Sequence, residues 1–570
     1  MGKWQVGFGL LLLGLLNLMA CSTLPEPEPV EPTSTRVVTV VVVPIVATRT
    51  KSPPLTPTPI PTAAPPTTNR PSATPQPTSE LVVAPATTPI GKTATAVPPT
   101  NPPTEIAATG EIIPSPTTPP ATETAVATTI ATAVVVTSLP PPPVGAAQPT
   151  IYETSITIPT YNYEAAFLPT TPDDPIYPYP RLDPALVGPP SPRTYRAIVL
   201  ENGFVAVTIL PELGGRIYQW RDKATGRRLL YNNPVIKPTS WGYRGWWLAA
   251  GGIEWAFPVD EHGLNEWRPW QVSTGSTAYG LSVTVSDVDD HTGMEAGATI
   301  SLDAGHAYVT IQPFARNNTA EAHPYQLWLN AMLSLSGNAV SDQTEFIFPA
   351  NQVTIHSTTD GGVPGSGSPM SWPVYNGRDL SWYSNWNGYL GFFVTAVTHG
   401  FSGVYDHAVD QGIIRAYNPG WPAGTKLFGP DGLSPAYWTD DNSNYIELWS
   451  GATSSFWSYA TLNPGESFSW TEYWYPVHGL GGFNFANRTA ALRLNDNGGS
   501  AEIGVAVSGG VTGRIILWAG GQEAANWPVT IYPGQAFRAT WTRPSSQTGA
   551  LGLQLLYNDG TVAAQTGLVP

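Results

Sequence analysis

Residues 201–226 read ENGFVAVTILPELGGRIYQWRDKATG, and this stretch decides the fold class. It opens on the tight-turn sequence Glu-Asn-Gly at 201–203, and Val and Ile then alternate with Ala and Thr over 205–209. Such a period of two places successive side chains on opposite faces of a strand, and Asn-Gly favours a hairpin turn. The stretch therefore predicts antiparallel strands, with a third at 217–220 that is closed by the turn at 222–226.

Short segments of the same kind recur downstream. They are GLSVTVSDV, EAGATISLDA, AYVTIQPFARNN, TEFIFPA, GYLGFFVTAV, GIIRAYN, YIELWSG and SFSWTEYWYPV. No long run has helical periodicity. We therefore expect a mainly β chain with a large antiparallel sandwich over 151–480.

A second sandwich is expected after the Gly-rich boundary VHGLGGFNFANRTA. Six short alternating segments follow it, separated by Gly, Asn and Asp turns. Residues 485–570 thus match a small immunoglobulin-like sandwich, whose role the sequence does not state.

The first 21 residues predict export. An apolar run over 6–19 follows Lys3 and ends at Leu-Met-Ala-Cys, which resembles a bacterial lipobox with Cys21 as the lipidation site. The alternative is a cleaved secretory signal with an incidental cysteine. Cys21 is the only cysteine, so a disulfide within the chain is excluded.

Residues 22–150 are dominated by Pro, Thr, Ala and Val, a composition that predicts a disordered stalk. We expect a lipoprotein held at the bacterial cell surface.

The net charge of the chain limits the classes of binding partner that we expect. Asp and Glu total 41 against 26 Lys and Arg, a formal net charge of −15, which argues against nucleic acid as a partner. A P-loop, a G-x-S-x-G elbow and an H-E-x-x-H motif are all missing from the sequence. Asp287, Asp289, Asp290 and His291 have calcium-ligand chemistry, but a plain turn between strands explains them. We expect neither a metal nor a cofactor.

Charged residues and tryptophans crowd together at 251–271, GGIEWAFPVDEHGLNEWRPWQ. A sugar site needs flat apolar faces for the C–H side of the ring and fixed polar groups for its hydroxyls. Trp255 and Trp267 supply the faces, and Glu254, His262 and Arg268 supply the polar groups.

The patterns ENGFVAVTILPELGGRIYQWRDKATGRRLLYNNPVIKP and GGIEWAFPVDEHGLNEWRPWQV resemble an uncharacterised family of the galactose mutarotase-like superfamily. Three sequence features are shared with aldose 1-epimerases and their non-catalytic relatives. They are an early Gly-Gly-Arg, a His-Gly followed by a Trp-containing segment, and a late glutamate. The resemblance covers 196–477. It implies a β-supersandwich with a carbohydrate cleft on a concave face.

By this resemblance, Arg216 holds a sugar hydroxyl, His262 positions or protonates the ring oxygen, and Glu447 is the general base. Asn330 stands where the epimerases have their second histidine, the principal general acid. Lys237 is a further residue of the cleft. Because asparagine donates a hydrogen bond but transfers no proton, the resemblance favours sugar binding over epimerase activity.

Three functions stay open. The first is carbohydrate binding at the cell surface. The second is an enzyme of the same fold, an aldose epimerase or a glycoside hydrolase, with Glu447 as base and His262 or Glu254 as acid. The third is a structural or adhesive surface protein. Glu254 also has a purely structural interpretation, as a buried carboxylate bonded to backbone amides or to Arg216.

Overall fold

The structure is a computed structural model that describes residues 134–136, 148–259, 261–420 and 424–570. The predicted signal peptide, Cys21 and most of the predicted stalk lie outside these residues. The chain divides into two compact units, 1–120 and 121–570, and every described residue belongs to the second. Within the described ranges, no helix is long and apolar enough to cross a membrane.

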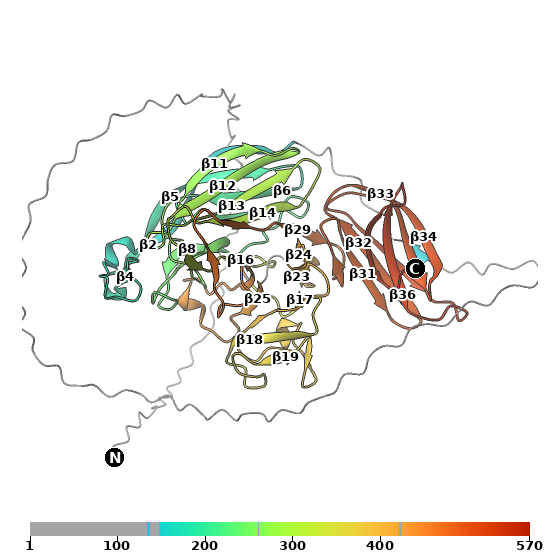
Figure 1. The fold of residues 1–570 in the computed structure, drawn as a ribbon. Helices are drawn as coiled ribbons and strands as arrows, with labels where there is room; N and C mark the ends of the chain where they lie inside the picture. The colour runs from blue at the N-terminus through green and yellow to red at the C-terminus, as the bar shows by residue number, and fades with distance from the viewer. Residues whose placement is uncertain (1–133, 137–147, 260, 421–423) are drawn as a thin grey trace, which may run out of the picture. The chain divides into compact units, whose positions relative to one another are not determined.

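A sheet of 13 strands forms the first layer (Figure 1). From one edge to the other its strands are β19 (Pro369–Ser371), β18 (Gln352–Thr358), β22 (Leu390–Phe393), β25 (Gly424–Gly429), β26 (Ile446–Gly451), β16 (Trp328–Leu333), β10 (Ile253–Ala256), β7 (Arg216–Asp222), β6 (Val205–Leu210), β5 (Gly188–Glu201), β2 (Thr150–Asn162), β8 (Asn232–Pro238) and β9 (Leu248–Gly251). Its pairs are antiparallel except for β2 with β8.

A sheet of nine strands forms the second layer. Its order is β11 (Gln271–Ser276), β12 (Gly280–Val288), β13 (Glu295–Asp303), β14 (Val309–Arg316), β29 (Glu472–His478), β24 (Gln411–Tyr417), β23 (Phe401–Asp406) and β17 (Thr344–Ile347), with β28 (Ser467–Ser469) paired to β14. Three two-stranded sheets and four 3₁₀ helices complete this region. They are β15 (His323–Tyr325) with β27 (Ala460–Leu462), β20 (Val374–Tyr375) with β21 (Arg378–Asp379), β3 (Phe167–Leu168) with β4 (Arg181–Leu182), η1 (Glu164–Ala166), η2 (Pro184–Leu186), η3 (Tyr383–Asn385) and η4 (Pro435–Tyr437).

The main hydrophobic core contains residues from both large sheets. Trp220 and Leu329 come from the first sheet, and Ile300 and Trp474 come from the second; each is fully buried. In strands such as β13 the buried residues alternate with less buried ones, as expected when one face of a strand packs on a core. The alternation seen in the sequence thus becomes two sheets packed face to face, a β-supersandwich.

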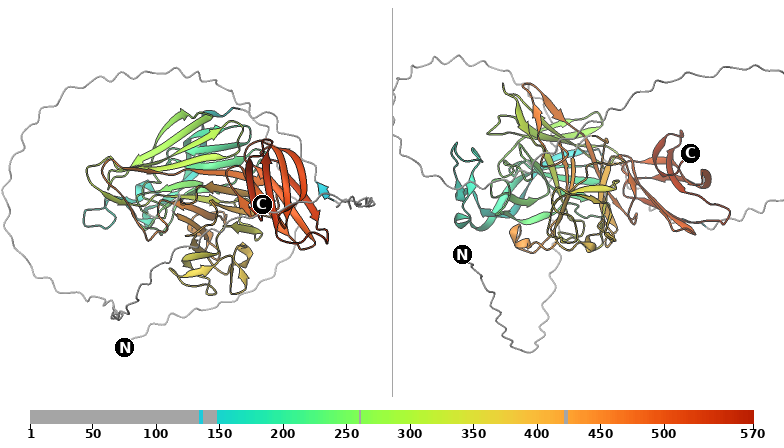
Figure 2. Two further views of the ribbon diagram at one scale, coloured as in Figure 1. Left: turned by 45° about the vertical axis from the view of Figure 1, so that its right-hand side comes forward. Right: turned by 60° about the horizontal axis from the view of Figure 1, so that its bottom comes forward.

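The C-terminal part forms a smaller sandwich (Figure 2). One sheet contains β1 (Val134–Val136), β35 (Ala536–Thr542), β32 (Ser500–Val507), β31 (Ala490–Asp496) and β30 (Phe485–Ala486), and the other contains β34 (Gln522–Ile531), β33 (Val511–Ala519), β36 (Leu551–Tyr557) and β37 (Val562–Gly567). Its core includes Trp541, Leu517 and Ile503.

The predicted fold class, a large antiparallel β-supersandwich followed by a small β-sandwich, is confirmed. Several elements differ from the expectation. No strand was predicted for residues 150–162, yet Thr150–Asn162 forms β2 and pairs along β5. No strand was predicted within the charged stretch 251–271, yet Ile253–Ala256 is a central strand of the first sheet. Val562–Gly567 adds a strand to the small sandwich.

A buried ion pair within the second sheet is hydrogen-bonded to the first sheet. Arg415 of β24 and Glu472 of β29 have no exposed side-chain surface, and their charged atoms are 3.0 Å apart. The guanidinium also donates to the Thr425 hydroxyl of β25 at 2.9 Å. The indoles of Trp470 and Trp474 donate to the carboxylate at 2.7 and 2.9 Å. Glu472 is therefore fully compensated despite its burial.

We expect Arg415→Met to lower the free energy of unfolding by about 3–5 kcal/mol, because it leaves the Glu472 carboxylate buried without its cation. Chemical denaturation measures this change. Arg196→Met is the matched control, since Arg196 pairs with Glu153 at a site where its side chain is 46% exposed. The control should cost no more than about 1 kcal/mol. Equal losses in the two variants would contradict the expectation.

Candidate functional site

Register across the first sheet brings polar and aromatic residues into one row. Glu254 of β10 pairs with Asn330 of β16, Asn330 pairs with Trp449 of β26, and Trp449 pairs with Lys426 of β25. Residues directly opposite each other on antiparallel strands project from the same face of the sheet. Glu447 lies two residues before Trp449 on β26 and so shares that face.

A cavity of about 370 Å³ opens over this row. Aromatic rings and a few charged groups form its wall. The lining residues are Trp241, Gly242, Trp247, Glu261, His262, His356, Ser357, Tyr389, Lys426, Phe428, Pro430, Leu433, Trp438, Tyr445, Glu447 and Trp449. A predominantly apolar wall with a few convergent polar groups is typical of a small-molecule site.

His262 is fixed on two sides. Its ring stacks on the indole of Trp247, with centroids 3.7 Å apart and planes 8° apart. Its Nδ1 lies 2.6 Å from the Glu254 carboxylate. Burial by itself would lower the pKa of His262, but Glu254, and after it Glu447 and Glu261, raise this pKa above its ordinary value. The imidazole thus faces the cavity as a hydrogen-bond donor held in one orientation.

Glu254 is held from behind by two further predicted residues. The Asn330 amide donates to Glu254 Oε1 at 3.1 Å. The Arg216 guanidinium lies 3.6 Å from Glu254 Oε2, and it also donates to the backbone oxygens of Leu213 and Gly251. Arg216, Glu254 and Asn330 are all buried and are not among the cavity-lining residues. They form a supporting layer that orients His262.

Glu447 and Lys426 form a second polar group in the cavity. The Trp449 indole donates to Glu447 Oε2 at 2.9 Å, and the Lys426 ammonium is 3.9 Å from the same oxygen. This ammonium also lies 4.5 Å from the Trp449 ring centroid and 4.8 Å from that of Phe456. Burial, and after it the Glu447 charge, raise the pKa of Tyr445 well above its ordinary value. Its phenol therefore stays protonated beside the carboxylate.

His356 is the second histidine of the cavity wall and has the opposite electrostatic environment. Burial, followed by the nearby Lys426 charge, lowers the pKa of His356 to about 3. At neutral pH the wall therefore contains one imidazole with a raised pKa, His262, and one uncharged imidazole.

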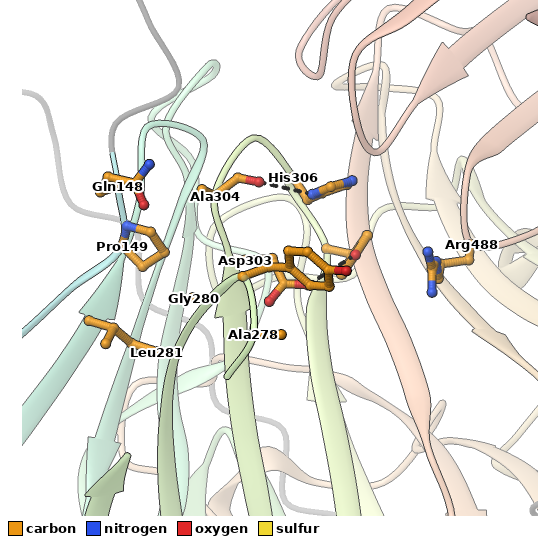
Figure 3. Close-up of a pocket in the computed structure, with 11 residues that line it drawn as sticks. Gln148, Pro149, Ala278, Gly280, Leu281, Asp303, Ala304, His306 and Arg488 are labelled. Carbon is orange, nitrogen blue, oxygen red and sulfur yellow. Dashed lines mark hydrogen bonds between the residues drawn. The ribbon is translucent and has the colours of Figure 1, made fainter. Parts of the chain in front are cut away.

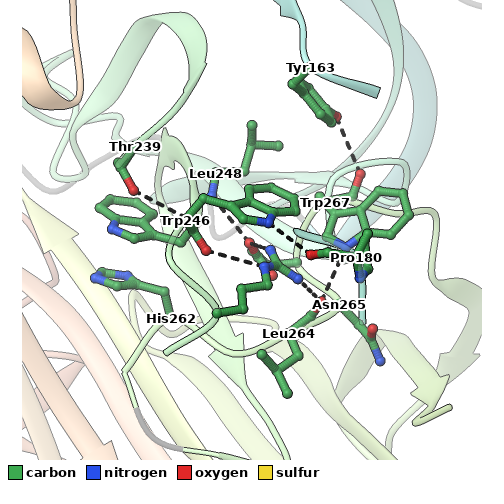
Figure 4. A network of polar contacts seen from close by, with 12 residues as sticks. Tyr163, Pro180, Thr239, Trp246, Leu248, His262, Leu264, Asn265 and Trp267 are labelled. Atoms are coloured by element: carbon green, nitrogen blue, oxygen red, sulfur yellow. Dashed lines mark hydrogen bonds and ion pairs between the residues drawn. The ribbon is translucent and has the colours of Figure 1, made fainter. Parts of the chain in front are cut away.

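The other predicted site residues lie elsewhere. The Lys237 ammonium is 2.7 Å from Asp440. Trp255 is buried in the main core and donates to the Gly215 oxygen. Trp267 donates to the Leu264 oxygen, and Figure 4 places it away from His262 across a polar network. The Arg268 guanidinium pairs with Asp287 and Asp290. Each of these side chains is engaged within the protein, and none is among the cavity-lining residues.

The turn at 287–291 has no group of metal ligands. Asp289 accepts from the Tyr179 hydroxyl at 2.5 Å and from Thr292, while Arg268 binds two of the neighbouring carboxylates. Among the described residues, no cluster of three or more His, Cys, Asp or Glu side chains could hold a metal ion.

A second depression, of about 730 Å³, lies near the connections between β11 and β12 and between β13 and β14 (Figure 3). Tyr279, Asp303, His306 and Arg488 are among its lining residues. Asp303 accepts from the Tyr308 hydroxyl, and the His306 ring contacts the Tyr308 ring, so these polar groups are partly occupied by each other. None of the predicted site residues lies here.

Sequence comparison identifies the family. A family described as a domain of unknown function (DUF5107) matches residues 172–477. The chain belongs to this family. The cavity lies within the DUF5107 segment, since all of its lining residues fall between 241 and 449.

Solved structures similar to the chain include a TPR-domain-containing protein from Parabacteroides distasonis, with 25% identity and a TM-score of 0.51. The match covers 58% of this chain and 55% of that protein, so the chain spans about half of this relative. A galactose mutarotase related enzyme from Lactobacillus acidophilus matches at 11% identity over 49% of this chain and 97% of its own, with a TM-score of 0.37. A galactose mutarotase-like protein from Clostridium acetobutylicum matches at 11% identity over 50% and 96%, with a TM-score of 0.34.

Several cavity residues were not predicted from the sequence, among them Trp247, His356, Lys426, Tyr445 and Trp449. Trp449 had a usable signal, because it is two residues from Glu447 in an alternating strand. Trp247, His356 and Lys426 lie far apart in sequence, and only the order of the strands brings them together.

We expect His262 to titrate above its ordinary pKa of about 6.5 and Glu254→Gln to lower that pKa, because the neutral amide no longer stabilises the imidazolium. NMR titration of the histidine ring signals measures both values. His356 is the internal control, since its pKa of about 3 should keep it uncharged across the titration in both proteins. An unchanged His262 titration in the variant would contradict the expectation.

The interaction between His262 and Glu254 should also make the free energy of unfolding depend on pH. A histidine whose pKa is higher in the folded than in the unfolded state contributes stability that is complete below the unfolded value. This contribution is lost as the pH rises through the folded-state pKa. Glu254→Gln should remove most of this contribution.

Proposed function

We propose that the cavity of the DUF5107 domain binds carbohydrate. The observation that carries the proposal is that His262 and Glu447 line one cavity of about 370 Å³ together with the rings of Trp241, Trp438 and Trp449. Aromatic faces suit the C–H side of a sugar ring, and fixed charged groups suit its hydroxyls. A wholly apolar ligand would desolvate these groups without giving them any further hydrogen bond.

The polar groups divide into donors and acceptors. The His262 imidazole, with Nδ1 held by Glu254, presents its other ring nitrogen as a donor, and the Lys426 ammonium is a second donor. The Glu447 carboxylate is an acceptor whose orientation is fixed by the Trp449 indole. Neighbouring hydroxyls of a sugar offer the matching combination, because each hydroxyl both donates and accepts.

An enzyme of the same fold is the second candidate, and one observation favours it. A raised-pKa imidazole, His262, and a carboxylate, Glu447, line the same cavity, so an acid and a base are both present. Glu254 is a weaker candidate for the acid than His262, because its carboxylate lies between Arg216 and His262 and is not part of the wall. Asn330 also lies behind the wall, bonded to Glu254.

We expect Glu447→Gln to weaken sugar binding by about 10-fold, since a charged acceptor is replaced by a neutral amide that donates as well as accepts. Proton NMR of the purified protein with a panel of mono- and oligosaccharides measures binding through line broadening and turnover through the anomeric signals. Arg268→Met is the matched control, because Arg268 comes from the same charged stretch but pairs with Asp287 and Asp290 outside the cavity.

The outcomes separate the three functions. Broadening without turnover supports a binding domain. Accelerated anomer exchange or new reducing ends that disappear in Glu447→Gln would make the protein an enzyme. Unchanged spectra across the panel would overturn the carbohydrate proposal and favour a structural or adhesive role.

We also propose that the protein is a lipoprotein at the bacterial cell surface, with Cys21 as its anchor. The proposal rests on the lipobox-like sequence before Cys21 and on the Pro/Thr-rich segment after it. Cys21→Ser should abolish incorporation of a labelled fatty acid and release the protein from the membrane fraction. Labelling that persists in this variant would contradict the anchor, because the chain has no other cysteine.

A further inference from the structure

Exposed aromatic rings continue the cavity wall on one side. Trp241 lines the cavity, and its ring centroid is 5.1 Å from that of Tyr437. The Tyr437 side chain is 46% exposed. Trp241 and Tyr437, which we call the first platform, therefore extend the aromatic wall into solvent.

A second set of rings continues the wall from another side. His356 lines the cavity, and its ring centroid is 6.3 Å from that of Trp457. Trp457 also contacts the Phe393 ring, with centroids 5.2 Å apart, yet it is 52% exposed. We call Trp457 the second platform.

The two platforms come from different connections of the chain: Tyr437 lies in η4, before the central strand β26, and Trp457 lies after β26. Trp241 lies in the connection between β8 and β9, which end the strand order on one side. Trp457 packs on residues of β18 and β22, which lie near the other end. The strands that carry Glu447, Lys426 and Glu254 lie between these ends. The exposed aromatic surface therefore joins the cavity wall at two separate lining residues, Trp241 and His356.

The size of the cavity limits how much of a ligand it can hold. At about 370 Å³ the cavity is near the lower limit of ligand pockets, which run from about 300 to 1,000 Å³. A sugar chain does not fit inside such a volume, so any units beyond those in the cavity would lie over the rim, where the exposed rings are. Single exposed aromatic residues are common on protein surfaces, but these rings contact residues that line the cavity.

We propose that the ligand is an oligo- or polysaccharide, with the cavity holding one part of the chain and the two platforms stacking the units on either side. This inference rests on the proposed carbohydrate function. It adds that the protein selects chains over free monosaccharides. The platforms supply apolar stacking area, whereas His262, Glu447 and Lys426 supply polar recognition in the centre.

The test compares each sugar with its own oligomers of increasing length. Calorimetric titration of the full chain with glucose, galactose, mannose and xylose, and with the β-1,4-linked oligomers of each, gives the dissociation constants. For a series that binds, each platform should tighten oligomer binding roughly 2- to 10-fold, the range that an aromatic stacking contact provides. Tyr437→Ala and Trp457→Ala should each remove one such gain and leave monosaccharide binding unchanged.

Tyr279→Ala is the matched control. Tyr279 is 75% exposed and lines the second depression rather than the cavity, so its removal should not change binding of any oligomer. Equal affinity for a monosaccharide and its oligomers, or platform variants that bind oligomers normally, would overturn this inference and leave the proposed function standing. Absence of binding by every sugar in the panel would overturn both. Oligomer binding weakened equally by Tyr279→Ala would also count against the platforms.

Discussion

The buried carboxylate of Glu254 is the interaction on which the rest of the site depends. It lies in the centre of the large sheet, between the guanidinium of Arg216 and the imidazole of His262. A charge at this depth is tolerated only when it is paired and hydrogen-bonded, so the three groups constrain one another. The consequence reaches the cavity, where His262 has one ring orientation and a raised pKa. Arg216 and Asn330 thus lie behind the wall, whereas His262 and Glu447 lie in it.

The order of the strands in the sheet brings other residues of the site together. Lys426, Trp449 and Asn330 are adjacent because β25, β26 and β16 are neighbours in the sheet. The indole of Trp449 then serves two groups, donating to Glu447 and presenting its face to the Lys426 ammonium. A sheet that buries its opposite face in the main core holds these side chains on a rigid base, which suits a binding site that requires fixed polar groups.

The fold class could be predicted from the sequence because alternation is a local signal, and segments such as 280–288 and 490–496 became strands with those bounds. β2 was missed because proline and tyrosine dominate the residues around it. In the site, His262 and Glu447 could be predicted because they sit in short recognisable patterns. Lys426 and His356 could not, because their proximity depends on long-range pairing. Arg268 and Lys237 were predicted as site residues but do not line the cavity. Each forms an ordinary ion pair instead, Arg268 with Asp287 and Lys237 with Asp440.

The long pairing of β2 with β5 has a mechanical consequence. β2 is the first strand of the large sheet along the chain, and its residues from Thr150 to Asn162 pair with β5, while Thr160 also pairs with Ile236 of β8. Tension applied along the axis of β2 would load its ladder of hydrogen bonds in shear, so that the bonds share the force instead of breaking one after another. The polypeptide thus enters the domain that contains the candidate site through β2, a strand suited to resist a pull from its N-terminal side.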